Sequence, residues 1–286
     1  MKFLGIRNGH DCNISYSDGK TVKYAKIERN VQTKHFFTGS LTGDHRDDVP
    51  ALLQYAIDIL GVDLNELDGI CISNDPNLHV LQREIQLNEL WFEIDRSTHP
   101  VWDQFKCPIF RIDHHYSHVL SNWPVVDLDT VSTHFVFDGL GDHGRVSGIF
   151  TSPDSFSSSG ELNHVLTEYV DRTENNGLSV TLEQVGHALG IQGIVLDIAG
   201  KLMALQSFHK VPKELEDQMV AMITPMKYRH LHQFIKIADQ YQKAITPEPD
   251  KHQKMLNLAH LLHVFGEQKL PAYFLEYANW TDTISY

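Results

Sequence analysis

The chain has 286 residues, enough for one large domain or two smaller ones. Hydrophobic residues make up 42% and charged residues 21%, an ordinary globular composition that excludes a disordered chain, a coiled coil and a collagen-like fibre. The formal charge of −13 disfavours broad binding to nucleic-acid phosphates. No stretch reaches the roughly 18 apolar residues that span a bilayer. The N-terminus also lacks an apolar secretory core, so we expect a cytoplasmic protein without membrane partners.

The first thirty residues predict an antiparallel meander. Strands are expected at 2–6, 13–16 and 21–27, where the residues are apolar or alternate between apolar and polar. Asp18-Gly19 separates the last two strands and is a strong hairpin signal.

Strands and helices alternate after this meander. Helices are expected at 49–60, 80–92 and 116–123, and strands at 67–73, 107–112, 133–137 and 146–151. From about residue 180 the apolar spacing becomes helical, with helices at 182–189, 199–208, 214–223, 228–245 and 255–270. The sequence therefore predicts a β-rich first half with inserted helices and a helical second half.

The strongest chemical signal is the run His114-His115-Tyr116-Ser117-His118. In a helix, His114 and His118 at positions i and i+4 share one face, which lets two imidazoles bind one metal ion. Such a pair alone is more often a polar helix start with surface histidines. A second signal is Asp138, which ends a predicted strand and precedes glycines. Two imidazoles and one carboxylate suit Fe(II), Mn(II) or Zn(II).

Glycine-containing segments give weaker signals for an anion. Gly139 and Gly141 would let the backbone approach a phosphate closely. The turn in Gly5–Asp11 would point its amides at an anion, as in the phosphate-cradling hairpin of the actin and sugar-kinase superfamily. Gly200-Lys201 could set a cation and helix amides near a nucleotide. Each segment alone is equally well explained by an ordinary turn or helix start.

Taken in order, these segments resemble the O-carbamoyltransferase family, which includes antibiotic and nodulation-factor carbamoyltransferases. The resemblance covers about residues 1 to 210, and its order and spacing make it far more specific than any single motif. The family's blocks are matched by Gly5–Asp11, loosely by Lys26–His35, and by His114–His118, Asp138–Gly141 and Gly200–Leu205.

The resemblance implies an α/β fold. It implies an actin/sugar-kinase-like (ribonuclease H-like) mixed sheet with flanking helices, followed by a helical region. We expect residues 1–180 to form a ribonuclease H-like lobe that carries the metal motif. Residues 181–286 are expected to form the mostly helical, incomplete start of a second lobe.

The resemblance also implies an activity. In the family, a YrdC-like domain makes carbamoyl-adenylate from carbamoyl phosphate and ATP. The first domain then moves the carbamoyl group to a substrate hydroxyl, using a bound metal that is usually iron. The implied ligands are therefore a small-molecule hydroxyl acceptor, ATP or carbamoyl-adenylate, and a divalent metal: Fe(II), with Mn(II) or Zn(II) as alternatives.

Site residues follow from the resemblance by position. The metal ligands look like His114, His118 and Asp138. The expected catalytic residues are His10, Lys34 and Asp197. The expected cofactor-binding residues are Gly9, Asp11, Gly139, Gly141, Gly200 and Lys201.

The sequence departs from the family pattern in several places. Ala199 stands where an acidic residue usually precedes Gly-Lys, and Gln206–His209 replaces the usual Ala-Pro-Tyr-Gly. The chain stops at Tyr286, before the Gly-Gly-rich segment, the late Asp and the YrdC-like domain of the family. We therefore expect a second polypeptide that carries the missing lobe and the YrdC-like domain.

Two alternatives stay open. The chain could be a catalytically inactive metal- or nucleotide-binding module, or one subunit of a split carbamoyltransferase. It could also belong with the tRNA threonylcarbamoyl-transfer enzymes, which share the His-x-x-x-His pair. The complete His-His-x-x-His block and the Gly-His-Asp turn favour the carbamoyltransferases, and the negative charge weighs against tRNA.

Overall fold

The described strands of the computed structural model form two β-sheets, one in each of two compact units. The first unit comprises Met1–Val125 and Gly141–His143, and the second comprises Val126–Leu140 and Gly144–Tyr286. The structure describes residues 1–8, 12–32, 48–74, 85–98, 100–122, 133–138, 141–151, 164–171, 186–187, 191–192, 198, 200–202, 204, 211–225, 251–275 and 284–285.

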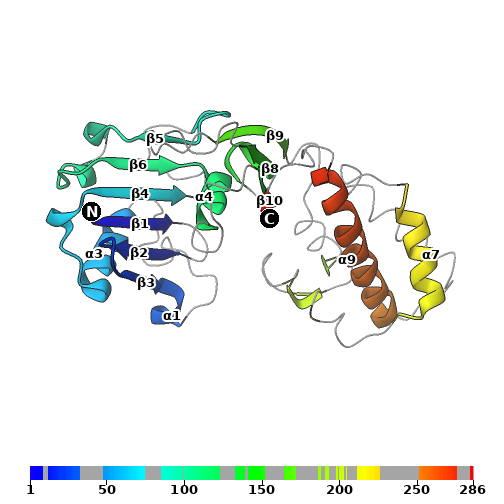
Figure 1. Cartoon of the computed structure of the whole chain (residues 1–286). Coiled ribbons are helices and arrows are strands. Elements are labelled where there is room, and N and C mark those ends of the chain that lie inside the picture. The colour runs from blue at the N-terminus through cyan, green and yellow to red at the C-terminus, as the bar shows by residue number, and fades with distance from the viewer. Residues whose placement is uncertain are drawn as a thin grey trace. The chain divides into compact units, whose positions relative to one another are not determined.

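The described part of the first unit is built on a sheet of six strands (Figure 1). They are β1 (Phe3–Asn8), β2 (Asn13–Ser17), β3 (Val22–Lys26), β4 (Gly69–Asn74), β5 (Trp91–Glu93) and β6 (Ile109–Ile112). Their order is β3-β2-β1-β4-β6-β5. The strands β1, β2 and β3 form an antiparallel meander, β4 and β6 continue parallel to β1, and β5 pairs antiparallel at the edge.

This strand order is that of a ribonuclease H-like sheet. A three-stranded meander leaves one side of β1 open, and parallel strands joined through crossover segments fill it. The hairpin between β2 and β3 turns at Asp18-Gly19 as predicted, with Gly19 at φ +81° and the Asp18 carboxylate accepting from the N–H groups of Lys20 and Thr21. The fold class expected from the sequence, a mixed α/β sheet with flanking helices, is confirmed.

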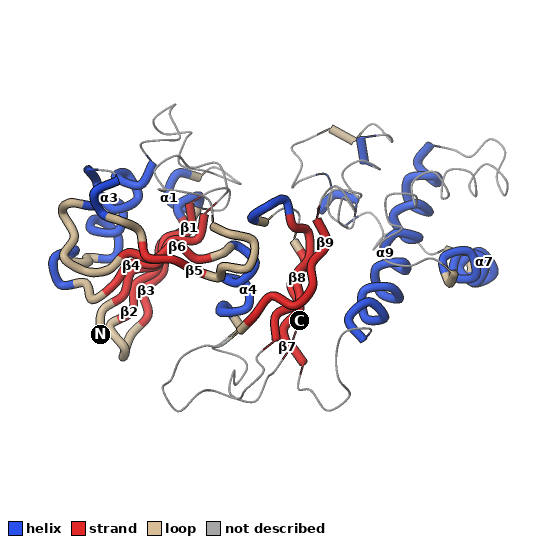
Figure 2. Tube along the Cα trace, turned by 90° about the horizontal axis from the view of Figure 1, so that it is seen from above, coloured by secondary structure: helices blue, strands red, loops and turns tan. Residues whose placement is uncertain are grey.

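Helices pack against this sheet and connect its strands. They are α1 (Ile27–Val31), α3 (Asp48–Leu60) and α4 (His114–Ser121), with 3-10 turns at Leu64–Glu66, Arg96–Thr98 and Pro100–Trp102. Helix α3 ends before Gly61, whose φ of +61° is the left-handed conformation that glycine adopts readily after a helix. Helix α3 packs against β1, β2 and β3, and it lies on the same side of the sheet as α1 (Figure 2). The hydrophobic core of this unit includes the fully buried Leu4 of β1, Ile14 of β2 and Leu52 of α3.

The sheet of the second unit repeats the first four strand positions. Its described strands are β7 (Thr133–Phe137), β8 (Arg145–Thr151), β9 (Val165–Asp171) and β10 (Ile284–Ser285). An antiparallel meander, β7 to β9, is joined by β10 parallel to β7, so β9-β8-β7-β10 corresponds to β3-β2-β1-β4. The expected domain boundary at residue 180 therefore falls inside the second unit, whose sheet begins at β7.

Two longer helices belong to the second unit. They are α7 (Lys213–Ile223) and α9 (Lys251–Leu275), which pack against each other. They correspond to the helices predicted at 214–223 and 255–270, whereas the one predicted at 228–245 lies outside the described residues. None of the described helices is both long and apolar enough to cross a membrane.

Candidate metal centre

The two histidines predicted to bind metal lie on α4, which starts directly after β6. Asp113 is the N-cap of this helix, and its buried carboxylate accepts a hydrogen bond of 2.8 Å from the N–H of Tyr116. This cap starts the helix at His114, two residues earlier than the sequence predicted. Because β1, β4 and β6 are parallel, α4 lies at their carboxyl ends (Figure 1), where ligands bind in open α/β sheets.

His114 and His118 lie one helical turn apart with their rings in contact. The ring centroids are 5.1 Å apart and the ring planes are inclined at 75°. A ring nitrogen of His114 lies within 4.8 Å of one of His118. Two nitrogens bound to one ion at about 2.0–2.1 Å are at most about 4.2 Å apart, so a small side-chain rotation would let both reach one ion. His114 is buried and His118 is exposed, so ligands can reach the pair from the His118 side.

A guanidinium contacts the buried member of this pair. Arg7 lies in β1, and its Nη1 is 2.9 Å from Nδ1 of His114. Because arginine carries donors and no acceptor, Arg7 donates this hydrogen bond and Nδ1 accepts it. The neutral His114 ring then carries its proton on Nε2.

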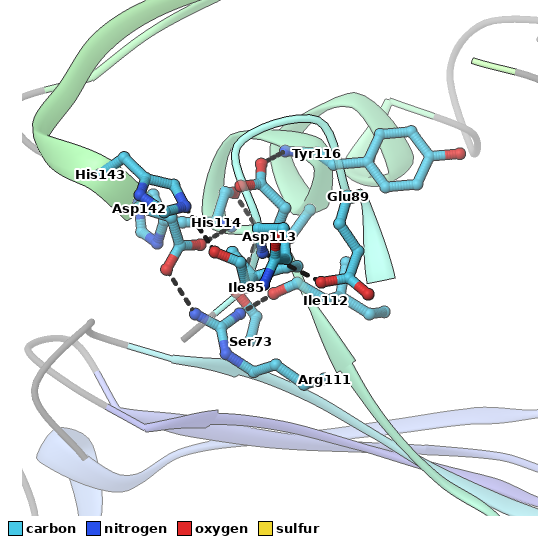
Figure 3. Close-up of polar contacts among 12 residues, drawn as sticks. Ser73, Ile85, Glu89, Arg111, Ile112, Asp113, His114, Tyr116, Asp142 and His143 are labelled. Atoms are coloured by element: carbon cyan, nitrogen blue, oxygen red, sulfur yellow. Dashed lines mark hydrogen bonds and ion pairs between the residues drawn. The ribbon is translucent and has the colours of Figure 1, made fainter. Parts of the chain in front are cut away.

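Asp142 fixes the first residue of α4 (Figure 3). One of its carboxylate oxygens accepts the main-chain N–H of His114 at 2.7 Å. The other accepts a hydrogen bond of 2.7 Å from Nη2 of Arg111, whose Nη1 donates to the carbonyl of Ile112. Asp142 and Arg111 are both buried, so this ion pair holds the start of the histidine-bearing helix without competition from solvent.

Sequence reasoning did not identify Arg111 and Asp142 as supporting residues. The available signal was an arginine inside an otherwise apolar strand, because a buried charge needs a partner. Asp142 stands at the end of the Asp-Gly-Leu-Gly-Asp run that was singled out for Asp138 and its glycines.

The neighbouring segment Gly141–His143 is also held in the first unit. His143 has φ +57°, and its Nε2 donates to the carbonyl of Ile85 (Figure 3). A Cβ on Gly141 would lie 2.5 Å from Nε2 of His115, whose side chain is fully buried. Room for the His115 ring is therefore one reason for glycine at 141, and a role of Gly141 in cofactor binding remains a prediction.

Tyr116 does not provide a base at this helix start. Burial raises the pKa of its phenol to about 12, so the hydroxyl stays protonated near neutral pH. In Figure 3 its ring points away from the Arg111–Asp142 pair.

The remaining predicted site residues belong to other segments of the sequence. Asp138 follows β7 in the second unit, where its N–H donates to the carbonyl of Val146 at 3.1 Å, and its role as a metal ligand remains a prediction. Gly200 and Lys201 are exposed, and Nζ of Lys201 donates to the carbonyl of Gln192 at 2.9 Å. The other predicted site residues lie outside the described residues: Gly9, His10, Asp11, Lys34, Gly139 and Asp197.

Comparison with known proteins does not assign a family. No protein-family model matches the chain. No curated protein matches it in sequence. One similar solved structure is an activator of the 2-hydroxyisocaproyl-CoA dehydratase from Clostridium difficile, with bound ADPNP. It is 10% identical, with 98% of this chain and 100% of that chain covered, but its TM-score is only 0.38. A similarity of this size carries no argument, so the resemblance to O-carbamoyltransferases rests on the sequence motifs alone.

Proposed function

We propose that this chain binds a divalent metal ion through His114 and His118, and that it transfers a carbamoyl group from carbamoyl-adenylate to a substrate hydroxyl. The observation that carries the proposal is the histidine pair itself. One ring nitrogen of His114 lies within 4.8 Å of one of His118, on a helix that starts at the carboxyl ends of parallel strands. The ordered motifs that resemble the O-carbamoyltransferases supply the choice of reaction.

The donor set fits a first-row divalent ion. Imidazole nitrogen binds Fe(II), Mn(II) and Zn(II), and a helical i, i+4 pair presents two such nitrogens on one face. We propose Asp138 as the third ligand. The resemblance supplies this choice, because Asp138 opens the segment Asp138–Gly141 that matches the family's block.

The reaction would need groups that activate the hydroxyl and stabilise the leaving phosphate. Bound metal would supply a Lewis acid that stabilises negative charge developing on oxygen. In our proposal His10 takes the proton from the acceptor hydroxyl, whose oxygen forms a bond to the carbamoyl carbon. The bond from that carbon to the phosphate oxygen breaks, and AMP leaves with the electron pair. Lys34 and Lys201 would offset the charge of the departing phosphate.

Three glycines and two acidic residues complete the proposed adenylate site. Gly9, Gly139 and Gly200 would let the backbone approach the phosphate. The exposed Gly200 is open to such an approach, because a side chain there would meet no atom within 4 Å. Asp11 and Asp197 are proposed to face the same ligand, by their positions in the resembling motifs.

Metal analysis tests the first half of the proposal. Protein purified without chelators should contain about one metal ion per chain, and a His114→Ala, His118→Ala variant should lose it. A control is the His187→Ala, His263→Ala variant, which also removes two imidazoles, both exposed and neither of them in α4. Equal metal content in all three proteins would overturn the metal site.

A turnover assay tests the second half of the proposal, which is carbamoyl transfer. Supplying carbamoyl-adenylate directly makes the assay independent of how that donor is made. With a panel of hydroxyl compounds, the metal-loaded wild type should form carbamates detectable by mass spectrometry, and the His114→Ala, His118→Ala variant should not. Metal binding without any carbamate would instead identify a binding module.

A further inference from the structure

The guanidinium of Arg7 holds one ring nitrogen of His114, the buried member of the proposed metal-binding pair. The backbone of Arg7 is fixed on both sides within the sheet, paired with Asn13 of β2 and with Ser73 of β4. From that anchored Cα the side chain reaches α4 and donates to Nδ1 of His114 at 2.9 Å. The contact joins residues 107 positions apart in the sequence, so the tertiary fold creates it.

This contact is incompatible with metal binding by His114. A metal ligand must offer a lone pair on a deprotonated nitrogen. In the observed state the lone pair of Nδ1 accepts from Arg7, and Nε2 of the neutral ring carries the proton. Metal-binding histidines normally donate their second ring N–H to an acceptor, but Arg7 offers no acceptor. A guanidinium and a divalent cation on one imidazole would also repel each other.

We propose that Arg7 and the divalent metal ion compete for His114, and that the guanidinium released by the metal binds a phosphate group of the substrate. This inference rests on the proposed function, because it takes the histidine pair as the metal site. Metal alone would bind less tightly than metal together with a phosphate, since it must displace Arg7. Metal together with a phosphate would bind more tightly, since the phosphate gives the displaced guanidinium a partner.

The chemistry of arginine selects the ligand class. Its planar fork of donors matches the oxygens of a phosphate and can bind two of them at once. Because the Arg7 backbone is held in β1, the released side chain stays beside the histidine pair. The ligand is therefore a phosphate-bearing molecule that reaches the metal with its phosphate group, which the adenylate of the proposed reaction provides.

Cobalt titration of an Arg7→Gln variant tests the competition. Co(II) bound to imidazole gives absorption bands that report binding without any enzyme assay. We expect Arg7→Gln to bind Co(II) about ten- to a hundredfold more tightly than the wild type in buffer without phosphate, the range for losing a hydrogen bond to a charged group. Adding inorganic phosphate or AMP should tighten Co(II) binding about tenfold or more in the wild type and leave Arg7→Gln unchanged.

Two further variants control the experiment. Lys23→Gln removes one positive charge from β3 of the same sheet, where Nζ donates to the carbonyl of Leu60, and should behave as wild type. Arg7→Lys keeps the charge and should retain part of the phosphate effect. It also covers the case in which Arg7→Gln fails to fold, which circular dichroism would reveal.

The outcomes separate this inference from the proposed function. If phosphate and AMP both tighten Co(II) binding, the phosphate group itself is recognised, whereas an effect of AMP alone assigns recognition to the nucleotide; both support the role of Arg7. Equal or weaker Co(II) binding by Arg7→Gln, or a phosphate effect that persists in it, overturns that role while the metal site stands. Co(II) binding that survives in the His114→Ala, His118→Ala variant overturns both.

Discussion

Asp142 is the residue on which the start of α4 depends most directly. Its carboxylate neutralises the buried Arg111 and accepts the N–H of His114. Removing one partner of a buried ion pair leaves an uncompensated charge. Asp142→Ala should therefore lower the free energy of unfolding by about 3–5 kcal/mol, measured by urea denaturation.

Two comparisons sharpen this prediction. Asp217→Ala removes an exposed partner of Lys213 at 2.9 Å, which should cost no more than about 1 kcal/mol. Combining Asp142→Leu with Arg111→Met removes both buried charges and should recover much of the stability lost in Asp142→Ala. A cost for Asp142→Ala no larger than that of Asp217→Ala would show that the buried pair does not hold the helix start.

Gly141 gives a second test at the scale of one residue. An added methyl group would lie 2.5 Å from Nε2 of the fully buried His115, so the ring or the backbone would have to shift. We expect Gly141→Ala to cost about 1–3 kcal/mol in thermal or urea unfolding. The control is Gly200→Ala, where nothing lies within 4 Å and the backbone is helical, so stability should stay equal or rise by about 0.5–1 kcal/mol. Equal effects of the two substitutions would contradict the packing argument.

A pair of buried histidines links two strands of the second sheet. His134 lies in β7 and His164 directly precedes β9, and their ring centroids are 5.0 Å apart. Burial lowers the pKa of His164 below 6.5. As the pH falls below 6.5, His164 becomes protonated in the unfolded chain but stays neutral in the folded protein. The free energy of unfolding therefore decreases with falling pH until the lower pKa of the folded state is reached. Above that window His164 contributes no pH dependence.

His164→Phe should reduce this pH dependence. Phenylalanine keeps an aromatic ring at this position but has no titratable group. The free energy of unfolding should therefore fall less steeply between pH 7 and pH 5 than in the wild type. The difference for one proton is at most about 1.4 kcal/mol per pH unit. Urea titrations at several pH values measure it, with the exposed His187→Gln as control. Parallel pH profiles for wild type and His164→Phe would exclude His164 as the titrating group.

Elements with a local signal could be predicted from the sequence, and those formed by distant pairing could not. The strand at 133–137 was predicted with the bounds of β7, because most of its residues are β-branched or aromatic and an Asp-Gly pair follows it. In contrast, the helix predicted at 80–92 is wrong where it is described, since Trp91–Glu93 forms β5. This segment forms a strand because it pairs with β6. The Trp91 ring also packs edge-on against the Phe110 ring, with the ring centroids 5.5 Å apart.

The candidate site shows the same limit. Helical spacing alone predicted that His114 and His118 would face each other. The contacts of His114 with Arg7 and Asp142 join residues 107 and 28 positions apart, and no local pattern encodes such pairs. Residue types and their spacing could therefore predict the candidate ligands. The residues that contact those ligands could be identified only from the three-dimensional structure.

The two sheets share a strand arrangement, and the same kinds of polar residue occur at corresponding strand ends. In each unit the first strand of the meander leads into an Asx-Gly pair in the sequence: Asn8, the last residue of β1, precedes Gly9, and Asp138-Gly139 directly follows β7. Corresponding ends of the two sheets thus carry polar residues of the same kind. The first unit adds the histidine pair of α4, and the second adds the acidic Asp138. If both contribute ligands to one ion, metal binding must stabilise the two units together.

Hydrogen exchange measures that coupling. A ligand that binds the folded state at 100 times its dissociation constant stabilises what it holds by about 2.7 kcal/mol. With saturating Co(II), amide protection should therefore rise in β1 and β4 of the first unit and also in β7 and β8 of the second. In Asp138→Ala the rise should persist in the first sheet and disappear from the second, because only the histidines remain as ligands. Protection that rises in the first sheet alone in the wild-type protein would remove Asp138 from the ligand set and leave the metal on α4 without a partner from the second unit.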